Sequence, residues 1–439
     1  MAVRPSCAGL AVAALALMAR GALAAGFGIE DHNASGLGFA NAGAAAAGED
    51  ASTIADNPAG IARLPDRQIV GAGTFINPHL PFQDEGSTFP GGARIGGGND
   101  NADQFAPVPS FFFSTPLGAG FTAGAGVFSN FGLATEYGAN WVGRYLAKST
   151  ELTTIDFAPT LAYRLLPELS VGVSPVLRYS KAKLATAIDF GAIGAAAGIP
   201  GVAPGSADGS IKVKGHDWST GFNGGLLFEP TDTTRLGLAY FWNDAATIKG
   251  SARFGRPALG NAIAAATGTF VNTDASLLLA YPDHLNFGVV QVLSPEVDVR
   301  FGLSWVQWSS FKEERFIFTN TLQPDAVTTE NWHDTVIVSV GGSYRLSPDL
   351  LLRAGIGYDP TPIPDAAHRD PRLPDQSRIE AAIGAGYRLT AATSVDVAYE
   401  HLFGVGPAKT DMTTATGDHI VGSTRLSADI FAVQLNLRF

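Results

Sequence analysis

The chain ends in the nine residues 431-FAVQLNLRF-439, and this stretch decides the fold class. Its large apolar side chains occupy every second position, at Phe431, Val433, Leu435, Leu437 and Phe439, while smaller or polar side chains fill the positions between them. Successive side chains of a β-strand point to opposite faces of the sheet. The period of two therefore predicts a strand with one apolar and one polar face.

The same alternation recurs along most of the chain. Leu352, Ile356 and Tyr358, for example, oppose Arg353 and Gly355. Turn signals between such segments predict about 14 strands, with ends uncertain by several residues. The predicted strands cover residues 67–78, 106–115, 119–136, 151–165, 169–188, 212–229, 233–254, 270–293, 296–318, 333–346, 350–362, 377–389, 393–405 and 424–439.

Residues 1–24 have the features of a secretory signal peptide. Arg4 precedes an apolar run of 12 residues, Ala8 to Ala19, and Ala22-Leu23-Ala24 is typical of a cleavage site. The run is too short for a spanning helix, which needs about 20 residues; a buried N-terminal helix is the alternative. Cys7, the only cysteine, would leave with this segment, which excludes disulfides and thiolate metal sites in the processed chain.

An exported chain without another long apolar run can span a membrane only as a closed β-barrel, because lipid leaves no partner for unpaired backbone groups. The apolar faces would then contact lipid and the small or charged faces would line the lumen. Alternation alone also fits a soluble β-sandwich. The signal peptide and the terminal aromatic Phe439, which has the form of a barrel-assembly signal, favour an all-β outer-membrane barrel. An even strand number returns both termini to the periplasmic side.

Composition excludes other classes of protein. The 439 residues carry a net charge of −11 and no basic tract, so the chain is not expected to bind nucleic acid. Its 27 phenylalanines and abundant aliphatic residues argue against intrinsic disorder.

Residues 25–66 differ from the rest, because they are rich in Gly and Ala and hardly alternate. We interpret them as a plug, or hatch, packed inside the lumen, with a disordered leader as the alternative. The predicted organisation is therefore a signal peptide at 1–24, a hatch at 25–66 and a transmembrane barrel at 67–439.

Several motifs resemble the FadL-type outer-membrane transporters of long-chain fatty acids and other hydrophobic compounds, including aromatic hydrocarbons. They follow one another over the whole processed chain: 25-AGF-27, 35-SGLG-38, 57-NPA-59, 129-SNFGLATE-136, 218-WSTGFNGGLLFE-229, 308-WSSF-311 and 352-LRAGIGYDPTPIPDAAHRDPRLPDQSR-378.

The resemblance implies a monomeric 14-stranded barrel in the outer membrane of a Gram-negative bacterium. Substrate would be captured at outer loops, pass to an inner pocket and leave sideways into the membrane by passive diffusion. The exit would be a kink in the third strand, at Ser129, Asn130 and Gly132, where glycine permits a bulge. Asn57 and Pro58 would contact that kink and couple hatch movement to it; a plain turn is the alternative.

The resemblance also suggests pocket residues. Phe27 would line the pocket, and Arg315, Lys181 and Lys183 would supply the cation that a buried fatty-acid carboxylate needs. Thr186 stands where a relative carries a cation, which leaves an aromatic or alkane hydrocarbon open as the substrate. We interpret Arg353, Asp359, Arg378 and Glu380 as a structural charge network facing the lumen.

Two outer segments, 192–204 and 258–266, are unexpectedly apolar and could form a first docking site, or simply pack on each other. A porin for polar solutes and an outer-membrane lipid hydrolase are the competing functions. We expect no enzyme, cofactor or metal site, because no G-x-S-x-G or H-E-x-x-H motif is present.

Overall fold

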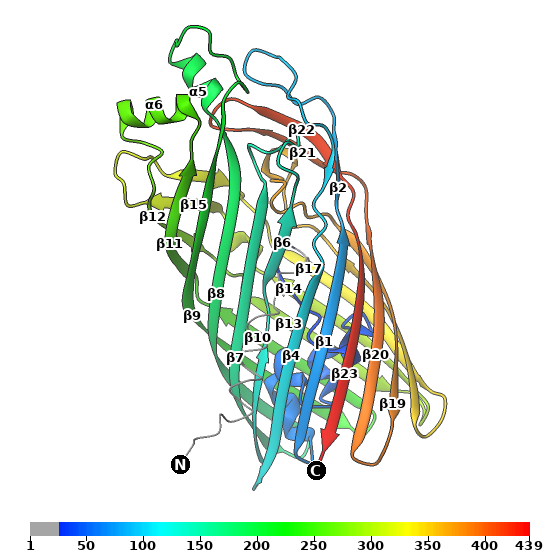
Figure 1. The fold of residues 1–439 in the computed structure, drawn as a ribbon. Coiled ribbons are helices and arrows are strands. Elements are labelled where there is room, and N and C mark those ends of the chain that lie inside the picture. The colour runs from blue at the N-terminus through cyan, green and yellow to red at the C-terminus, as the bar shows by residue number, and fades with distance from the viewer. Residues whose placement is uncertain (1–25) are drawn as a thin grey trace, which may run out of the picture.

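The computed structural model describes residues 26–439, which form a closed barrel of 14 antiparallel strands (Figure 1). The predicted signal peptide 1–24 lies outside the described residues. In order around the wall, the barrel strands are β1 (Gln68–His79), β4 (Ala106–Gly118), β5 and β6 (Phe121–Phe128 and Gly132–Glu136), β7 (Ser149–Leu166), β8 (Leu169–Asp189), β9 (Asp208–Thr231), β10 and β11 (Thr234–Asn243 and Ala246–Gly255), β12 and β13 (Thr273–Leu279 and His284–Val292), β14 and β15 (Val297–Val306 and Glu313–Phe318), β17 (Thr335–Arg345), β18 (Leu350–Asp359), β19 (Arg378–Arg388), β20 (Thr393–Gly404) and β23 (Ser427–Arg438).

The first and last strands close the barrel. They pair antiparallel over their whole length, from Gln68 opposite Arg438 to His79 opposite Ser427. The predicted number of strands and the predicted fold class are confirmed.

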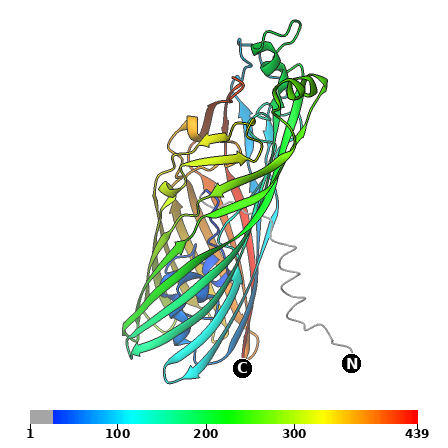
Figure 2. The same cartoon turned by 90° about the vertical axis from the view of Figure 1, so that its left-hand side faces the viewer.

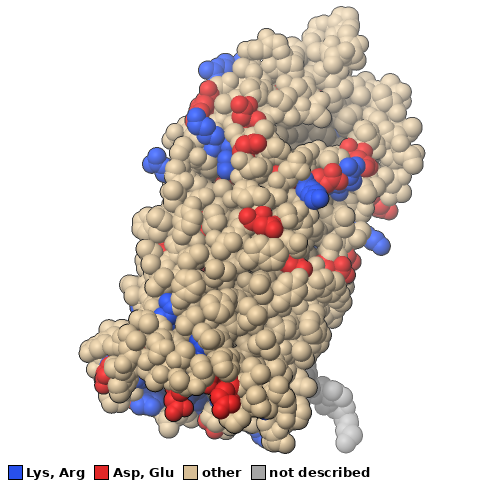
Figure 3. All heavy atoms as spheres, turned by 180° about the vertical axis from the view of Figure 1, so that it is seen from behind, with Lys and Arg blue, Asp and Glu red and all other residues tan. Residues whose placement is uncertain are grey.

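The wall presents its large apolar side chains outward, as predicted. In β23, Phe431 and Val433 are 51% and 50% exposed, while Ala432 and Gln434 between them are buried. Figure 3 views the barrel from behind and shows charged side chains in the upper half and at the lower end, with a largely uncharged band between them. None of the helices within residues 26–439 is long and apolar enough to cross a membrane.

The end of the barrel opposite the C-terminus carries the long connections (Figure 2). A small four-stranded sheet lies there, formed by β2 (Pro81–Asp84), β3 (Asp100–Asn101), β21 (Ala408–Thr413) and β22 (His419–Thr424). Helices α5 (Phe190–Ala196) and α6 (Ala258–Thr267) and strand β16 (Ala326–Thr329) belong to three other connections. The turn η3 (Ala366–His368) lies in the link between β18 and β19.

The N-terminal segment lies inside the barrel, at the end that holds the C-terminus (Figure 1). It forms three single turns of helix and a 3-10 helix: α2 (Ala34–Leu37), α3 (Ala44–Ala47), α4 (Thr53–Asp56) and η1 (Pro58–Arg63). These contact strands on several sides of the lumen, α2 touching β19, β20 and β23, α3 touching β10 and β13, and η1 touching β7, β8 and β9.

Glycine on the lumen face makes this packing close. A Cβ atom at Gly237 of β10 would lie 1.9 Å from the carbonyl oxygen of Ala45. Any other residue there would clash with the backbone of the N-terminal segment, so small lumen-facing residues and the inner segment depend on each other.

Three neighbouring wall strands break where the sequence predicts continuous strands at 233–254, 270–293 and 296–318. Pro282 lies in the break between β12 and β13, and η2 (Trp308–Ser310) lies in the break between β14 and β15. The breaks allow Tyr281, Trp308 and Phe311 to point into the lumen, where all three are buried.

Candidate functional site

The third barrel strand is interrupted between β5 and β6. The Ser129 hydroxyl donates a hydrogen bond to the carbonyl of Thr154 on β7 (2.6 Å), and the Thr154 hydroxyl donates to the carbonyl of Phe131 (2.6 Å). Side-chain hydrogen bonds thus replace the backbone ladder at this point. The interruption falls where the sequence predicts a kink, at Ser129, Asn130 and Gly132.

This interruption leaves part of β4 without a neighbour. The pairing of β4 with β5 stops at Phe111 opposite Val127, and in the described chain no pairing joins β4 to β6. Residues 106–110 of β4 therefore pair only with β1. Pro107 and Pro109 lie in this stretch, and a proline has no N–H to leave unpaired. The wall therefore lacks ladder hydrogen bonds between β4 and β6 at this point.

The start of the N-terminal segment docks on the interruption. The Ile29 N–H donates to the carbonyl of Asn130 (2.8 Å), and the Gly132 N–H donates to the carbonyl of Phe27 (2.9 Å). Gly28 forms an isolated antiparallel bridge with Phe131. Residues 27–29 thus act as a very short strand that pairs with the broken part of the wall.

An aromatic cluster surrounds Phe27. Its ring is buried, and its centroid lies 4.9 Å from that of Trp308, 5.4 Å from Phe311, 5.9 Å from Phe131 and 6.1 Å from Trp332. The edge-to-face contacts with Trp308 and Phe311 are a favoured geometry for aromatic pairs. The structure places Phe27 at the centre of a packed aromatic cluster, and its role in a ligand pocket stays a prediction.

Gly26 fits where no other residue would. Its φ of +60° is in the left-handed region, and a Cβ atom would lie 2.4 Å from the ring of Trp332 and 2.9 Å from that of Trp308. The chain therefore enters the aromatic cluster through a position that requires glycine.

A buried cation stands beside this cluster. Arg178 of β8 is 1% exposed and donates from Nε and Nη2 to the carboxylate of Asp156, both at 2.7 Å. Its guanidinium lies 4.6 Å from the ring centroid of Phe131 and 4.7 Å from that of Tyr281. Asn130 also donates to Asp156 (2.7 Å), so the charge pair is tied to the strand interruption. Within residues 26–439, Arg178 Nη1 has no hydrogen-bond partner.

A cavity of about 100 Å³ adjoins the cluster and is lined by both the N-terminal segment and the wall. Its lining includes Phe131, Trp308 and several acidic groups, among them Glu30 and Asp56. Burial, reinforced by neighbouring carboxylates, raises the pKa of Glu30 to about 8 and that of Asp56 to about 7. In the described part of the chain, no group of three or more His, Cys, Asp or Glu side chains is placed to hold a metal ion.

Three of the four residues in the predicted charge network come together at this cavity. Arg378 contacts the carboxylates of Asp359 (2.5 Å) and Glu380 (3.8 Å), and also that of Asp375 (3.2 Å). Arg353 does not join them, because it pairs with Asp396 at 2.7 Å in a separate part of the lumen.

Asn57 and Pro58 hold the N-terminal segment to a different part of the wall from the one predicted. Asn57 donates to the carbonyls of Ala45 (2.6 Å) and Leu226 of β9 (2.9 Å). Pro58 lies against Gly172 of β8, where a Cβ atom would come within 2.4 Å of the proline carbonyl carbon. The predicted contact of Asn57 and Pro58 with the kink is therefore wrong, and residues 27–29 make that contact instead.

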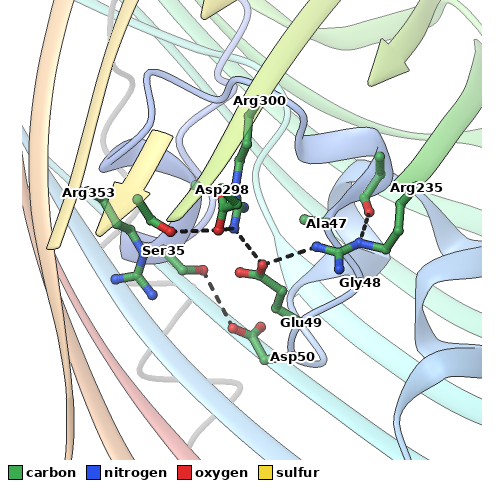
Figure 4. Close-up of polar contacts among 12 residues, drawn as sticks. Ser35, Ala47, Gly48, Glu49, Asp50, Arg235, Asp298, Arg300 and Arg353 are labelled. Carbon is green, nitrogen blue, oxygen red and sulfur yellow. Dashed lines mark hydrogen bonds and ion pairs between the residues drawn. The ribbon is translucent and has the colours of Figure 1, made fainter. Parts of the chain in front are cut away.

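Glu49 anchors the middle of the segment (Figure 4). Its carboxylate accepts from Arg300 of β14 (2.6 Å) and Arg235 of β10 (3.5 Å), and Arg300 also donates to Asp298 (2.9 Å). Burial alone would raise the pKa of Glu49, but the two guanidinium groups outweigh it and hold the pKa at about 2.

The predicted pocket cations do not reach the lumen. Lys181 and Lys183 share the outward face of β8 with the exposed Leu177, and Lys183 pairs outside the barrel with Glu151 (2.8 Å). Arg315 is likewise outward, 39% exposed and paired with Glu313 and Asp325. This corrects the expectation that Lys181, Lys183 and Arg315 line an inner pocket with Phe27.

Sequence reasoning missed Arg178 as the buried cation. The signal that could have identified it was its position on the polar, inward-facing side of an alternating strand, opposite to that of Lys181.

The apolar outer segments partly pack on each other. Gly194 of α5 faces Leu259 of α6, where a Cβ atom would lie 3.2 Å from the leucine side chain. Their role in docking stays a prediction.

The similarity to known proteins extends over nearly the whole chain. A 47 kDa outer membrane protein of Pasteurella multocida is 29% identical over 440 residues, covering 98% of each chain. The long-chain fatty acid transport protein of Escherichia coli O6:H1 is 30% identical over 409 residues, covering 89% of this chain and 90% of that protein.

Solved structures share the fold. The crystal structure of a Pseudomonas aeruginosa FadL homologue superposes with a TM-score of 0.86 at 24% identity, covering 94% of this chain and all of that one. The Pseudomonas putida toluene transporter TodX superposes with a TM-score of 0.69 at 17% identity, covering 89% and 94%. The family model for the outer membrane protein transport protein family (OMPP1/FadL/TodX) matches residues 15–439. The chain therefore belongs to the OMPP1/FadL/TodX family of outer-membrane transport proteins of Gram-negative bacteria.

Proposed function

We propose that this protein takes up hydrophobic compounds, above all long-chain fatty acids, by passive diffusion through the barrel. The observation that carries the proposal is the aromatic cluster around Phe27, which lies directly against the interrupted third strand. Several relatives named long-chain fatty acid transport proteins support the same substrate class.

The path starts at the apolar connections that contain α5 and α6 and ends at the wall between β4 and β6. A hydrophobic solute gains about 25 cal/mol for each Å² of apolar surface kept from water. Movement from the aromatic cluster sideways into lipid keeps that surface shielded from water, whereas release into the periplasm exposes it. Residues 106–110 of β4 pair with β1 on one side only, so an exit on their other side breaks the fewest ladder hydrogen bonds.

Arg178 is the group that distinguishes a fatty acid from a hydrocarbon. A carboxylate taken out of water needs a charged or hydrogen-bonding partner, and the free Nη1 of Arg178 offers one beside the aromatic rings. A neutral hydrocarbon needs no such group. The aromatic lining and the structural likeness to a toluene transporter make a hydrocarbon the second candidate substrate.

The remaining parts of the proposal concern the chain as a whole. Residues 1–24 direct export, residues 25–66 act as the hatch, and the barrel from residue 67 works as a monomer, since one chain closes the wall. The exposed C-terminal Phe439 is recognised by the barrel-assembly machinery.

The test compares uptake of labelled oleate and of toluene by cells that carry either the wild type or the double variant Arg178→Gln/Asp156→Asn. Both partners are changed together, because removal of one alone leaves a buried charge at a cost of about 3–5 kcal/mol. The expected result is at least tenfold slower oleate uptake with toluene uptake unchanged.

The matched control is Arg353→Gln/Asp396→Asn, which removes another buried lumen pair away from the cluster. Equal loss of oleate uptake in both double variants would refute the assignment to Arg178. Large, steady ion conductance of the wild type in planar bilayers would favour a porin over the proposed function. Release of fatty acid from a lipid ester by the purified protein would favour a hydrolase.

A further inference from the structure

A cluster of cations occupies the outward face of three adjacent strands, β8, β9 and β11, on the left of Figure 1. The cationic patch consists of Lys181, Lys183, Lys212, Lys214, Lys249 and Arg253. It holds five of the chain's eight lysines, although the chain as a whole carries a net charge of −11. The clustering therefore runs against the overall charge balance.

The strand register places like charges directly opposite each other. Lys183 of β8 is the cross-strand partner of Lys214 of β9, and Lys212 of β9 is the partner of Arg253 of β11. Side chains so paired have Cβ atoms about 5 Å apart, and like charges at that distance destabilise a sheet. A local conflict of this kind is expected where a function maintains it.

The protein itself supplies few counter-charges. Glu151 of β7 pairs with Lys183. The other five cations of the patch have no ion-pair partner within residues 26–439. Asp274 of β12 also faces outward, but its cross-strand partner on β11 is Ser251 rather than a cation.

The patch lies just beyond the aromatic edge of the lipid-facing wall. Trp218, 58% exposed, packs against Tyr179 in a tilted arrangement with ring centroids 5.1 Å apart, and aromatic girdles mark the membrane interface in such barrels. Lys214 precedes Trp218 by four residues and lies nearer the outer end of β9, at about 13 Å along the strand for a rise of about 3.3 Å per residue. Because the strands of such barrels are tilted by about 35–45°, the rise along the membrane normal is smaller, and Lys214 lies on the head-group side of the aromatic girdle.

We propose that the cationic patch binds the phosphate groups of a phosphorylated glycolipid in the outer leaflet, namely the lipid A part of lipopolysaccharide. Lysine binds phosphate as a compact point charge. Acyl chains of the same lipid would lie along the apolar wall below Trp218. The proposal rests on the outer-membrane location and is independent of the substrate that passes through the lumen.

The test measures binding of bis-phosphorylated lipid A to the purified full barrel in a neutral detergent, by native mass spectrometry at several lipid concentrations. The variant Lys181→Gln/Lys214→Gln/Lys249→Gln removes one cation from each strand of the patch. The expected result is binding weaker by a factor on the order of 100, from the loss of three lysines near an anionic surface. Lipid A without phosphates should bind the wild type as weakly as it binds the variant.

The matched control changes the three lysines outside the patch, Lys148, Lys312 and Lys409, to Gln, which alters the net charge equally. It should bind lipid A like the wild type. Heat-dependent migration on a gel reports whether each variant forms a closed barrel. The proposal is overturned if both triple variants lose the same affinity, if dephosphorylated lipid A binds the wild type equally well, or if the patch variant keeps wild-type affinity.

Discussion

Truncation of Phe27 should release the start of the N-terminal segment from the broken strand. Phe27 is 1% exposed and contacts five aromatic rings, and its carbonyl accepts the hydrogen bond of the Gly132 N–H. Phe→Ala at a fully buried site costs about 3–5 kcal/mol. If that loss falls on the equilibrium in which residues 26–29 detach from β6, the detached fraction rises at least about 100-fold, because each 1.4 kcal/mol changes an equilibrium constant tenfold.

Native-state hydrogen exchange of the Gly132 amide measures this opening directly. In Phe27→Ala the protection factor should fall by about two orders of magnitude or more, while amides in β18 and β19 keep theirs. The matched control is Phe82→Ala, which removes an equally buried ring that packs on Trp141 in the small outer sheet. Unchanged Gly132 protection in Phe27→Ala, or an equal loss in Phe82→Ala, would refute the claim that the aromatic cluster holds the segment on the interruption.

Gly132→Val should stiffen the start of β6 and slow uptake of labelled oleate several-fold while binding to the purified protein stays unchanged; normal uptake would remove the interruption from the exit route. Deletion of the processed chain from its start through Pro58 should empty much of the lumen and raise single-channel ion conductance in planar bilayers, and wild-type conductance would speak against a plug. The pKa of Glu30 is raised in the folded state, so the protonated group is favoured there and stability is lost as pH rises through about 8. Protection of the Ile29 amide, corrected for intrinsic exchange, should fall between pH 6 and pH 9 in the wild type, and Glu30→Gln should abolish that dependence.

The alternating strands could be predicted because each wall residue has only two environments, lipid and lumen. Phe431 and Gln434 illustrate how cleanly the side chains separate. The breaks in β10–β15 could not be predicted, because Tyr281 and Trp308, which lie in two of them, pack on Phe27, a residue far away in the sequence. The outer sheet was missed for a related reason: its strands are two to six residues long, and the pairing of β2 with β22 spans more than 300 residues of sequence.

The errors at the candidate site have a physical lesson. Lys181 and Lys183 have the same parity along β8 as the lipid-facing Leu177, whereas Arg178 has the opposite parity. Strict use of the two-residue period would have placed the lysines outside and the arginine inside. The contact between Phe27 and Gly132 was beyond reach, because no local pattern reports which distant strand receives the chain start.

Strand β23, which closes the barrel, also binds the N-terminal segment inside it. Gln434 of β23 accepts hydrogen bonds at its side-chain oxygen from the backbone N–H groups of Ala34 (3.0 Å) and Ser35 (3.3 Å), and its amide nitrogen donates to Asp50 (2.9 Å). Without the N-terminal segment, Gln434 would lose these three hydrogen bonds and keep its bond to Asn436 of the same strand (2.7 Å). Closure of the barrel seam and seating of the N-terminal segment are therefore thermodynamically linked, because the strand that pairs with β1 also binds residues 34–50.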